Sequence, residues 1–415
     1  MKRYSEYKDS GVKWIGEIPG HWEIRRLKNV VLCNAETLSE NFPKDEVIKY
    51  VEISDVNYTS GITNIQRMPF GEAPSRARRI TKKNDVIVST VRTYLKAVAK
   101  IQEDGLIVST GFAVLHPLIG NSSFLSYFAL SESFIHNVIV NSKGISYPAI
   151  TASDLICIAM PLPPLSEQEA IVTYLDSKVD KIDEYISIAE KKIAALEELK
   201  QTIIAEAVTR GIHKDVPMKD SGVKWIGMIP EHWDCCKLKY FTRIKSGDAL
   251  TNNALSDTGK YKVYGGGDFM GFYDKYNVDA NTILIGRVGA RCGCVTITEE
   301  KAWATDNALI LIHFNINTKF LTYLLVAANL NSLSISNAQP LITGSKVKDS
   351  FIPIPPLPEQ QEIVSYLDSK VANINQLCQA ERSQIEKLKE YKQRLISDVV
   401  TGKVKVTNDS LNGRV

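Results

Sequence analysis

The strongest constraint on the fold of this 415-residue chain is an internal duplication. The string KDSGVKWIG opens two similar segments, residues 8–28 and 219–239, which share 15 of 21 residues at an offset of 211. A second pair of segments, residues 161–182 and 353–374, shares 15 of 22 residues at an offset of 192. Sequence repeats of this kind indicate structural units that fold alike.

The offsets differ by 19 residues (211 − 192), so the first copy has the longer interior. Between the matching ends, residues 29–146 and 240–338 are largely unrelated. We therefore predict two half-proteins, each consisting of a common frame (the matching segments) around an insert of its own. The predicted domains are a strand-rich domain at 1–160, a long helix at 161–217, a second strand-rich domain at 218–352 and a second long helix at 353–415.

The segment after each PLPPL or PIPPL string has the period of a coiled-coil helix, with apolar residues alternately three and four apart. The prolines limit extension of each helix backwards, and Gly211 and Gly402 occur where each pattern stops. Two equal helices from a duplication are expected to pair antiparallel; a seam buried within a single core is the alternative. The predicted seam residues are Ile182, Ile186, Ile193, Leu196, Ile203, Ile374, Ile385, Leu388, Leu395 and Val399.

The inserts have the composition of mixed α/β (α+β) domains. In the first, DVIVST (85–90) and LKAVAKI (95–101) flank a short VRTY connection. In the second, NTILIG (281–286) and CGCVTI (292–297) flank RVGAR. Such β-branched runs around a short polar connection predict neighbouring strands. The predicted fold is thus two strand-rich domains with two long antiparallel coiled-coil helices and a pseudo-twofold internal repeat.

Composition narrows the class of protein. The N-terminus has no apolar run of a secretory signal, and no stretch approaches the roughly 18 apolar residues of a membrane span. Seven scattered cysteines favour reduced thiols, so we expect a cytoplasmic protein without a membrane association. The net charge is only +3, but residues 67–100 carry nine basic side chains against two acidic ones, a pattern typical of polyanion binding or of a solvated face.

No catalytic motif is present. A G-x-x-x-x-G-K-[ST] phosphate loop is absent, and the glycines at 265–267 do not continue into a G-x-G-x-x-G register. The prolines at 163–164 and 355–356 precede leucine, which excludes the tetrad that holds a flipped adenine in amino-methyltransferases. The cysteines lack the spacing of a zinc site. We therefore predict no catalytic residues, no metal ligands and no enzymatic activity for the chain itself.

Basic and aromatic residues near the predicted hairpins suggest a DNA-binding surface instead, because lysine and arginine contact phosphates and arginine reads guanine. Each residue taken alone is as consistent with an ordinary surface charge or a core tyrosine. The candidates are Arg76, Arg78, Arg79, Lys82, Lys83, Arg92, Thr93, Tyr94, Lys96, Lys143, Ser146, Lys245, Ser246, Tyr264, Gly265, Gly266, Arg287, Arg291 and Lys346.

The two KDSGVKWIG-x-IP-x-HW segments and the two P-[LI]-PPL-x-EQ…IV-x-YLDSKV helix starts make the chain resemble the specificity subunit of a type I restriction–modification system. The run YGGG…LIGRVGA…TDNA (264–308) adds to the resemblance, which covers essentially the whole chain. The family has no motif for individual base-reading residues. The first insert lacks the glycine-rich run, which indicates inserts of different types with different targets.

The resemblance implies that each insert is a target recognition domain for one half of an asymmetric, bipartite site in double-stranded DNA. It implies that the helices set the distance between half-sites and that the chain docks two modification subunits and the restriction subunits. S-adenosylmethionine, ATP and Mg²⁺ are then expected in those partners, with no cofactor in this chain. A coiled-coil protein–protein scaffold and a standalone DNA-processing enzyme are the alternative hypotheses.

Overall fold

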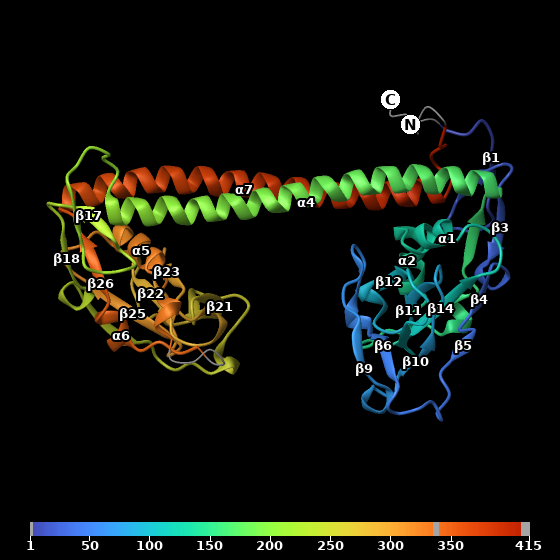
Figure 1. Cartoon of the computed structure of the whole chain (residues 1–415), viewed down its shortest axis with the longest axis horizontal. Helices are drawn as coiled ribbons and strands as arrows, with labels where there is room; N and C mark the ends of the chain where they lie inside the picture. The colour runs from blue at the N-terminus through green and yellow to red at the C-terminus, as the bar shows by residue number, and fades with distance from the viewer. Residues whose placement is uncertain (1–2, 335–339, 408–415) are drawn as a thin grey trace. The chain divides into compact units, whose positions relative to one another are not determined.

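The computed structural model describes residues 3–334 and 340–407 (Figure 1). The chain divides into two compact units: unit 1 comprises Met1–Ala189 with Ser383–Val415, and unit 2 comprises Glu190–Arg382. The long helices α4 (Leu165–Arg210) and α7 (Leu357–Val400) each contribute residues to both units. The predicted fold class of two strand-rich domains with two long helices is confirmed, while the four predicted domain boundaries stay predictions.

The centre of unit 1 is a four-stranded antiparallel sheet in the order β12-β11-β14-β4. Its strands are β12 (Val98–Lys100), β11 (Val86–Ser89), β14 (Phe112–Pro117) and β4 (Val31–Cys33). Because side chains alternate across a strand, Val86 and Val88 face one hydrophobic core and Ile87 faces another. Both faces of this sheet are therefore covered, which explains why the sequence of β11 is apolar throughout.

A second sheet covers one of those faces, in the order β5-β10-β13-β6-β9. Its strands are β5 (Glu36–Thr37), β10 (Ala77–Ile80), β13 (Ile107–Ser109), β6 (Val47–Val51) and β9 (Gln66–Pro69). The pair β13–β6 is parallel, whereas its other pairs are antiparallel. A small hairpin, β7 (Val56–Asn57) with β8 (Gly61–Ile62), completes the insert.

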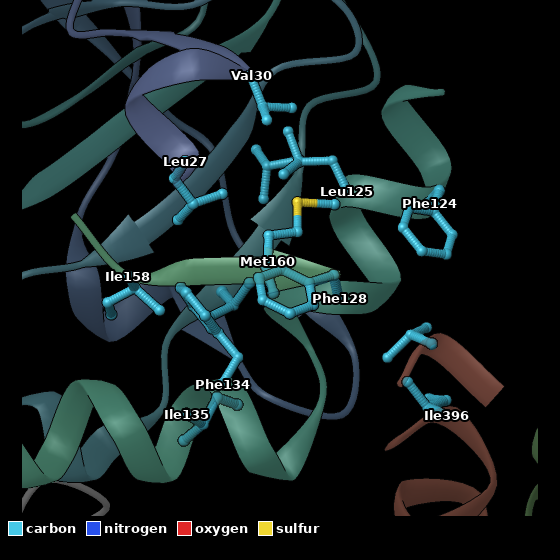
Figure 2. Packing of buried hydrophobic residues seen from close by; sticks show 14 of the residues in the cluster. Leu27, Val30, Phe124, Leu125, Phe128, Phe134, Ile135, Ile158, Met160 and Ile396 are labelled. Atoms are coloured by element: carbon cyan, nitrogen blue, oxygen red, sulfur yellow. The ribbon is translucent and has the colours of Figure 1, made fainter. Parts of the chain in front are cut away.

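Helices cover the other face of the central sheet. They are α1 (Ser122–Ala129), α2 (Glu132–Val140) and the single turn α3 (Ala152–Leu155), capped by the side chains of Asn121, Ser131 and Thr151 respectively. Figure 2 shows aromatic and aliphatic side chains from α1 and α2 packed with Met160 and with Ile396 of α7. The end of α7 is thus part of the core of unit 1.

Unit 2 repeats this architecture. Its central antiparallel sheet has the order β19-β25-β22-β23, and the sheet on its far face has the order β21-β20-β24 with a parallel β20–β24 pair. The strands are β19 (Thr242–Ser246), β25 (Ala308–His313), β22 (Ile283–Gly286), β23 (Val295–Ile297), β21 (Asp268–Tyr273), β20 (Tyr261–Gly265) and β24 (Ala302–Ala304). The helices are α5 (Thr318–Ala327) and α6 (Gly344–Lys348).

The two inserts therefore share one topology despite their unrelated sequences. Strands β4, β11, β12 and β14 of unit 1 correspond in chain order and sheet order to β19, β22, β23 and β25 of unit 2. Strands β6, β9 and β13 likewise correspond to β20, β21 and β24. Strands β5, β7, β8 and β10 have no counterpart in the described part of unit 2, in keeping with the longer interior of the first copy.

The duplicated frame forms the same pair of two-stranded sheets in each unit. In unit 1, β1 (Tyr7–Asp9) pairs with β2 (Glu17–Pro19), and β3 (Glu23–Arg26) pairs with β15 (Ala159–Leu162). In unit 2, β16 (Met218–Asp220) pairs with β17 (Met228–Pro230), and β18 (Asp234–Lys237) pairs with β26 (Phe351–Ile354). The second pairing joins the start of each copy to the segment just before its long helix.

Residues that are identical in the two repeats make the same contacts in both units. Trp22 is fully buried, and its indole Nε1 donates to Glu167 Oε2 at 3.1 Å, while His21 Nε2 lies 2.7 Å from the same oxygen. In unit 2, Trp233 donates to Glu359 Oε2 at 3.0 Å, and His232 Nε2 lies 2.9 Å from that oxygen. The glutamate in the first turn of each long helix thus ties that helix to its frame.

The glutamine that follows each of these glutamates connects the helix to the insert. Gln168 is buried; its Nε2 donates to Pro163 O at 2.8 Å and its Oε1 accepts from Asn121 N, the cap of α1, at 2.8 Å. Gln360 makes the equivalent bonds to Pro355 O, at 2.9 Å, and from the backbone N of Asn317, which caps α5, at 2.8 Å. The helices α1 and α5 of the two inserts are therefore attached to the frame in the same way.

Within each unit, segments of α4 and α7 run antiparallel. In unit 2, Lys192 pairs with Glu381, and Lys200, further along α4, donates to Asn375, which comes earlier on α7. The two segments therefore run in opposite directions. In unit 1, Lys392 donates to both oxygens of Asp183 at 2.7 Å. The seam residues are all buried or half-buried: Ile182, Ile186, Ile193, Leu196, Ile203, Ile374, Ile385, Leu388, Leu395 and Val399.

Each long helix ends at the predicted glycine, and both glycines have a left-handed backbone. Gly211 (φ +78°) lies against Trp233 in unit 2, and Gly402 (φ +76°) lies against Pro19 and Trp22 in unit 1. A Cβ on Gly402 would come within 2.4 Å of Pro19 Cδ, whereas the nearest atom at Gly211 is 3.3 Å away. Glycine is thus required by backbone conformation at both positions and by space at Gly402.

Candidate nucleic-acid interface

The first candidate surface is the connection between β11 and β12, here called the first tip (residues 91–96). Arg92 and Lys96 both have left-handed backbones, with φ of 50° and 54°, around a 3-10 turn at Thr93–Leu95. Thr93 is buried and its Oγ1 lies 2.8 Å from Ser142 Oγ, so it supports the tip from inside. Arg92 and Tyr94 are exposed, while Lys96 lies over the ring of Tyr58 at 5.5 Å.

A second loop is fastened to the first tip. This projecting loop (residues 143–149) is closed by two backbone hydrogen bonds between Lys143 and Ala149, of 2.8 and 2.9 Å. Its root is bound to the tip by a β-bridge between Val91 and Ala149. The Arg92 guanidinium lies 5.0 Å from the centre of the Tyr147 ring, a cation–π distance. The two exposed candidates Lys143 and Ser146 lie on this loop.

A groove of about 400 Å³ runs beside the first tip. Arg76 and Arg92 both line it, together with backbone and side-chain atoms of Ser109, Thr110 and Gly111. Arg76 is exposed and bonds Glu52 Oε2 through Nε (2.9 Å) and NH2 (2.7 Å), and these bonds raise the pKa of Arg76. The residues that line the groove thus include two arginines, Glu52 and several small polar residues.

The other members of the basic stretch lie elsewhere. Arg78 lies over the ring of Phe70 at 5.1 Å, and Arg79 lies in the middle of β10, where its Nε is buried without a hydrogen-bond partner. Lys82 is exposed and forms an ion pair with Glu36, and Lys83 is exposed at the turn before β11. These four basic residues have different surroundings, so the sequence cluster does not form one patch.

The second candidate surface is the connection between β22 and β23, here called the second tip (residues 287–291). It is built like the first. Val288 forms a β-bridge with Leu341, as Val91 does with Ala149, and Gly289 has the left-handed backbone (φ +73°) that Arg92 has in unit 1. The equivalent positions are therefore occupied by unlike side chains.

Basic groups of the second tip are held by neighbouring polar groups. Arg291 is exposed, and its Nε lies 2.8 Å from Asp268 Oδ2. Arg287 is half-buried; its NH1 donates to Ser246 Oγ at 3.4 Å, and its Nε is buried without a partner. Lys245 is exposed beside Ser246 on β19, and Lys346 is exposed on α6 with its Nζ donating to Leu333 O at 3.1 Å.

The glycine-rich run of unit 2 serves packing. A Cβ on Gly286 would lie 2.0 Å from Gly266 O, and a Cβ on buried Gly265 would lie 2.2 Å from Met270 Sδ. These glycines allow β20 to approach β22 and the second tip closely. Tyr264, half-buried, packs against the small core between the two sheets of unit 2.

Sequence reasoning missed the apolar part of the first candidate surface. Val91, Leu95 and Ile145 are exposed there, and Val91 and Leu95 line the groove beside Arg92. The sequence offers only a weak signal for this part of the surface, an isoleucine between a glycine and a serine (Gly144-Ile145-Ser146), where a turn is expected.

In residues 3–334 and 340–407, no three histidine, cysteine, aspartate or glutamate side chains are grouped so that they could hold a metal ion. No helix in the same ranges is both long and apolar enough to span a membrane.

Comparison with known proteins agrees with this architecture. The family model described as the type I restriction modification DNA specificity domain matches residues 19–198 and 230–387. Two similar proteins come from Methanocaldococcus jannaschii. The "Type I restriction enzyme MjaVIII specificity subunit" is 27% identical over 307 residues, covering 67% of this chain and 69% of the relative. The "Putative type I restriction enzyme MjaX specificity subunit" is 26% identical over 441 residues, covering 96% and 98%.

A solved structure shows the same fold. It comes from work on complex assembly and conformational transition of the type I R-M system. The matching chain superposes with a TM-score of 0.72 at 25% identity, covering 93% of this chain and 99% of that chain. The family model alone matches more than half of the sequence. The chain therefore belongs to the DNA specificity subunits of type I restriction–modification systems, the components that recognise DNA and leave catalysis to their partners.

Proposed function

We propose that this chain reads an asymmetric, bipartite target in double-stranded DNA, with one insert for each half-site. The observation that supports this best is that the first and second tips have the same backbone construction but carry different side chains. The same scaffold then meets DNA twice in the same manner, while unlike residues select unlike bases. The resulting target is bipartite because there are two inserts and asymmetric because their surfaces differ.

The candidate residues fit the two parts of DNA recognition. Exposed cations such as Lys143 and Lys245 suit phosphate contacts, which supply affinity and its salt dependence. Arg92 and Arg291 are exposed at the tips, where a planar guanidinium can pair with the O6 and N7 atoms of guanine. Arg76 bonds Glu52 through both Nε and NH2, whereas Arg291 contacts Asp268 through Nε, so we assign Arg76 to positioning the groove.

The repeated frame supports the second part of the proposal, which is that the chain docks two modification subunits together with the restriction subunits. A duplicated surface offers the same site to two copies of one partner. The methyltransferase chemistry on adenine, with S-adenosylmethionine, and ATP- and Mg²⁺-dependent restriction would then belong to those partners. We propose that the assembly works in the cytoplasm of its host, where its DNA substrate lies.

The long helices are proposed to set the spacing between half-sites. Spacing along DNA follows from protein dimensions, because each added base pair also rotates the next half-site around the duplex. Removing seven residues, two helical turns, shortens an α-helix by about 10 Å, roughly three base-pair steps. Helices α4 and α7 would have to be shortened together because their segments pair.

Methylome sequencing tests the proposal. A host that expresses this chain with its modification subunit should carry methylated adenines in one bipartite motif. Replacing Arg92 with alanine should relax or abolish one half-site only, and replacing Arg291 should affect only the other. Arg92→Lys is the matched control: it keeps the charge but loses the guanidinium fork, so a base contact is lost and a phosphate contact is kept.

Three results would contradict the proposal. Methylation without a bipartite motif would refute the reading of two half-sites. A change in both half-sites after the Arg92 substitution would refute the assignment of one insert to each. If paired seven-residue deletions in α4 and α7 left the spacer length unchanged, the helices would not set it.

A further inference from the structure

The projecting loop (residues 143–149) carries a side chain that no packing or ion pair in the described structure explains. Ile145 is fully exposed at its outer end, directly after Gly144, whose φ of +107° turns the chain outward. The loop is nevertheless held firmly at its root by two hydrogen bonds between Lys143 and Ala149 and by the bridge from Ala149 to Val91. An aliphatic side chain is thus presented to solvent on a short, fixed support.

The surroundings of Ile145 indicate what it meets. Lys143 lies at the root of the loop, and Arg92 lies on the first tip next to Val91. Both side chains are exposed. Tyr147 is 66% exposed, but its ring is held by the Arg92 guanidinium. The nearby groove carboxylate, Glu52, is already bonded to Arg76. An exposed apolar side chain near exposed cations suits a partner that has negative charge on its outside and stacked apolar surfaces within, which describes a DNA duplex.

We infer that Ile145 is a wedge that enters between two stacked base pairs of the half-site read by the first insert. Apolar side chains such as isoleucine unstack a base step in this way and bend the duplex. Lys143 would bind a flanking phosphate and hold the loop in place, while Arg92 on the adjacent tip reads a base. This inference rests on the proposed function and adds to it a residue that acts through the shape of the DNA.

A wedge at Ile145 also predicts part of the target sequence. Pyrimidine–purine steps such as TA and CA/TG unstack most easily, so the wedge favours such a step at the point of entry. Specificity then arises at a position where no hydrogen bond to a base is made. Substitution of Ile145 should leave the directly read bases unchanged but weaken the preference at that one step.

Fluorescence of 2-aminopurine measures the unstacking directly. The complex of this chain with its modification subunit is mixed with duplexes of the target found by methylome sequencing. Each duplex has 2-aminopurine at a different position of that half-site other than the methylated adenine, which the modification subunit itself unstacks. Binding of the unsubstituted complex should increase fluorescence at one step. Ile145→Ala should remove most of that increase and weaken binding by about tenfold, the loss typical of one important interface side chain. Ile145→Met, which keeps an apolar wedge, should retain both.

Two variants separate this role from general surface effects. Leu118 is also largely exposed in unit 1, so Leu118→Ala is the matched control and should change neither fluorescence nor affinity. Lys143→Ala should weaken binding to all sequences alike and lower the slope of log affinity against log salt by about 1, without changing the fluorescence increase. Because Ile145 is exposed, its substitution leaves the folded core intact, and an unchanged melting temperature checks this.

The outcomes distinguish the two proposals. If the complex binds its half-sites specifically but Ile145→Ala behaves like Leu118→Ala, the wedge is wrong and the proposed function stands. If the unsubstituted complex shows no half-site preference at all, the proposed function fails and the wedge with it. A fluorescence increase that survives Ile145→Ala but disappears with Tyr147→Ala would move the wedge to the tyrosine and overturn the assignment.

Discussion

The glutamate at the start of each long helix provides a test of how the duplicated frame is held together. Glu167 accepts hydrogen bonds from the fully buried Trp22 indole (3.1 Å) and from the buried Tyr4 hydroxyl, and it pairs with exposed His21. Burial, followed by this hydrogen bond, raises the pKa of Tyr4, so its hydroxyl stays a donor. Among residues 3–334 and 340–407, the hydrogen-bond partners of the Glu359 carboxylate are Trp233 and His232.

Replacing Glu167 with alanine leaves two buried donors without an acceptor. An unpaired buried donor costs about 1–3 kcal/mol, and an exposed histidine pair contributes about 0–1 kcal/mol. Since a fifth of the Glu167 side chain is exposed and water can enter the vacated space, we expect a loss of about 2–4 kcal/mol in the free energy of unfolding of unit 1. Glu359→Ala leaves one buried donor, the Trp233 indole, without an acceptor. It should lower the free energy of unfolding of unit 2 by about 1–3 kcal/mol.

Urea unfolding of the full chain, followed by tryptophan fluorescence, measures both effects. Glu167→Gln is the matched control, because its amide oxygen can still accept from Trp22, and it should lose less than the alanine variant. The reasoning is refuted if Glu167→Ala unfolds at the same urea concentration as the unsubstituted chain. It is also refuted if Glu359→Ala is the more damaging of the two.

Two further perturbations follow from the backbone and from burial. Gly402→Ala strains a left-handed backbone and forces a Cβ against Pro19, so we expect a loss of about 1–3 kcal/mol, larger than for Gly211→Ala; equal melting temperatures for the two variants would contradict this. Burial lowers the pKa of His313 below its usual 6.5, so folding favours the neutral ring and the unfolded chain binds a proton first as the pH falls. The stability of unit 2 should therefore be complete above pH 6.5 and decline below it. His313→Gln should flatten that decline in pH-dependent urea titrations, whereas His136→Gln, at an exposed site, should leave it unchanged.

Much of the fold could be predicted from the sequence because its signals are local. The 3.5-residue period of the seam predicts both long helices, and the glycines at 211 and 402 predict where they end. The β-branched run of residues 86–89 predicts strand β11. Each of these depends on the conformational preferences of a few neighbouring residues, and those preferences act wherever the segment is placed in the protein.

The common topology of the two inserts could not be predicted, because strand order depends on long-range pairing and not on residue identity. Unrelated sequences reach the same order because both alternate in the same way between two cores: Val86, Ile87 and Val88 in one, and Ile283, Leu284 and Ile285 in the other. Any apolar side chains of suitable size meet that requirement.

The arrangement of side chains in the candidate interface likewise depends on long-range contacts. The sequence predicted candidate DNA-binding residues at the two tips, and this stays a prediction. It also grouped Arg78, Arg79 and Lys82 with Arg92 because they are close in the chain. Only the structure separates them, since successive residues of β10 point to opposite faces and Lys82 turns toward Glu36. It also brings Ile145, some fifty residues away, to the first tip.

Taken alone, the sequence determined that the chain is a duplication with two unlike inserts on a shared frame, since identity between segments is visible without any coordinates. The tertiary structure alone decided which side chains reach a common surface. The physical reason is that strand pairing and the fastening of residues 143–149 to the first tip join distant parts of the chain, and no local preference specifies such contacts.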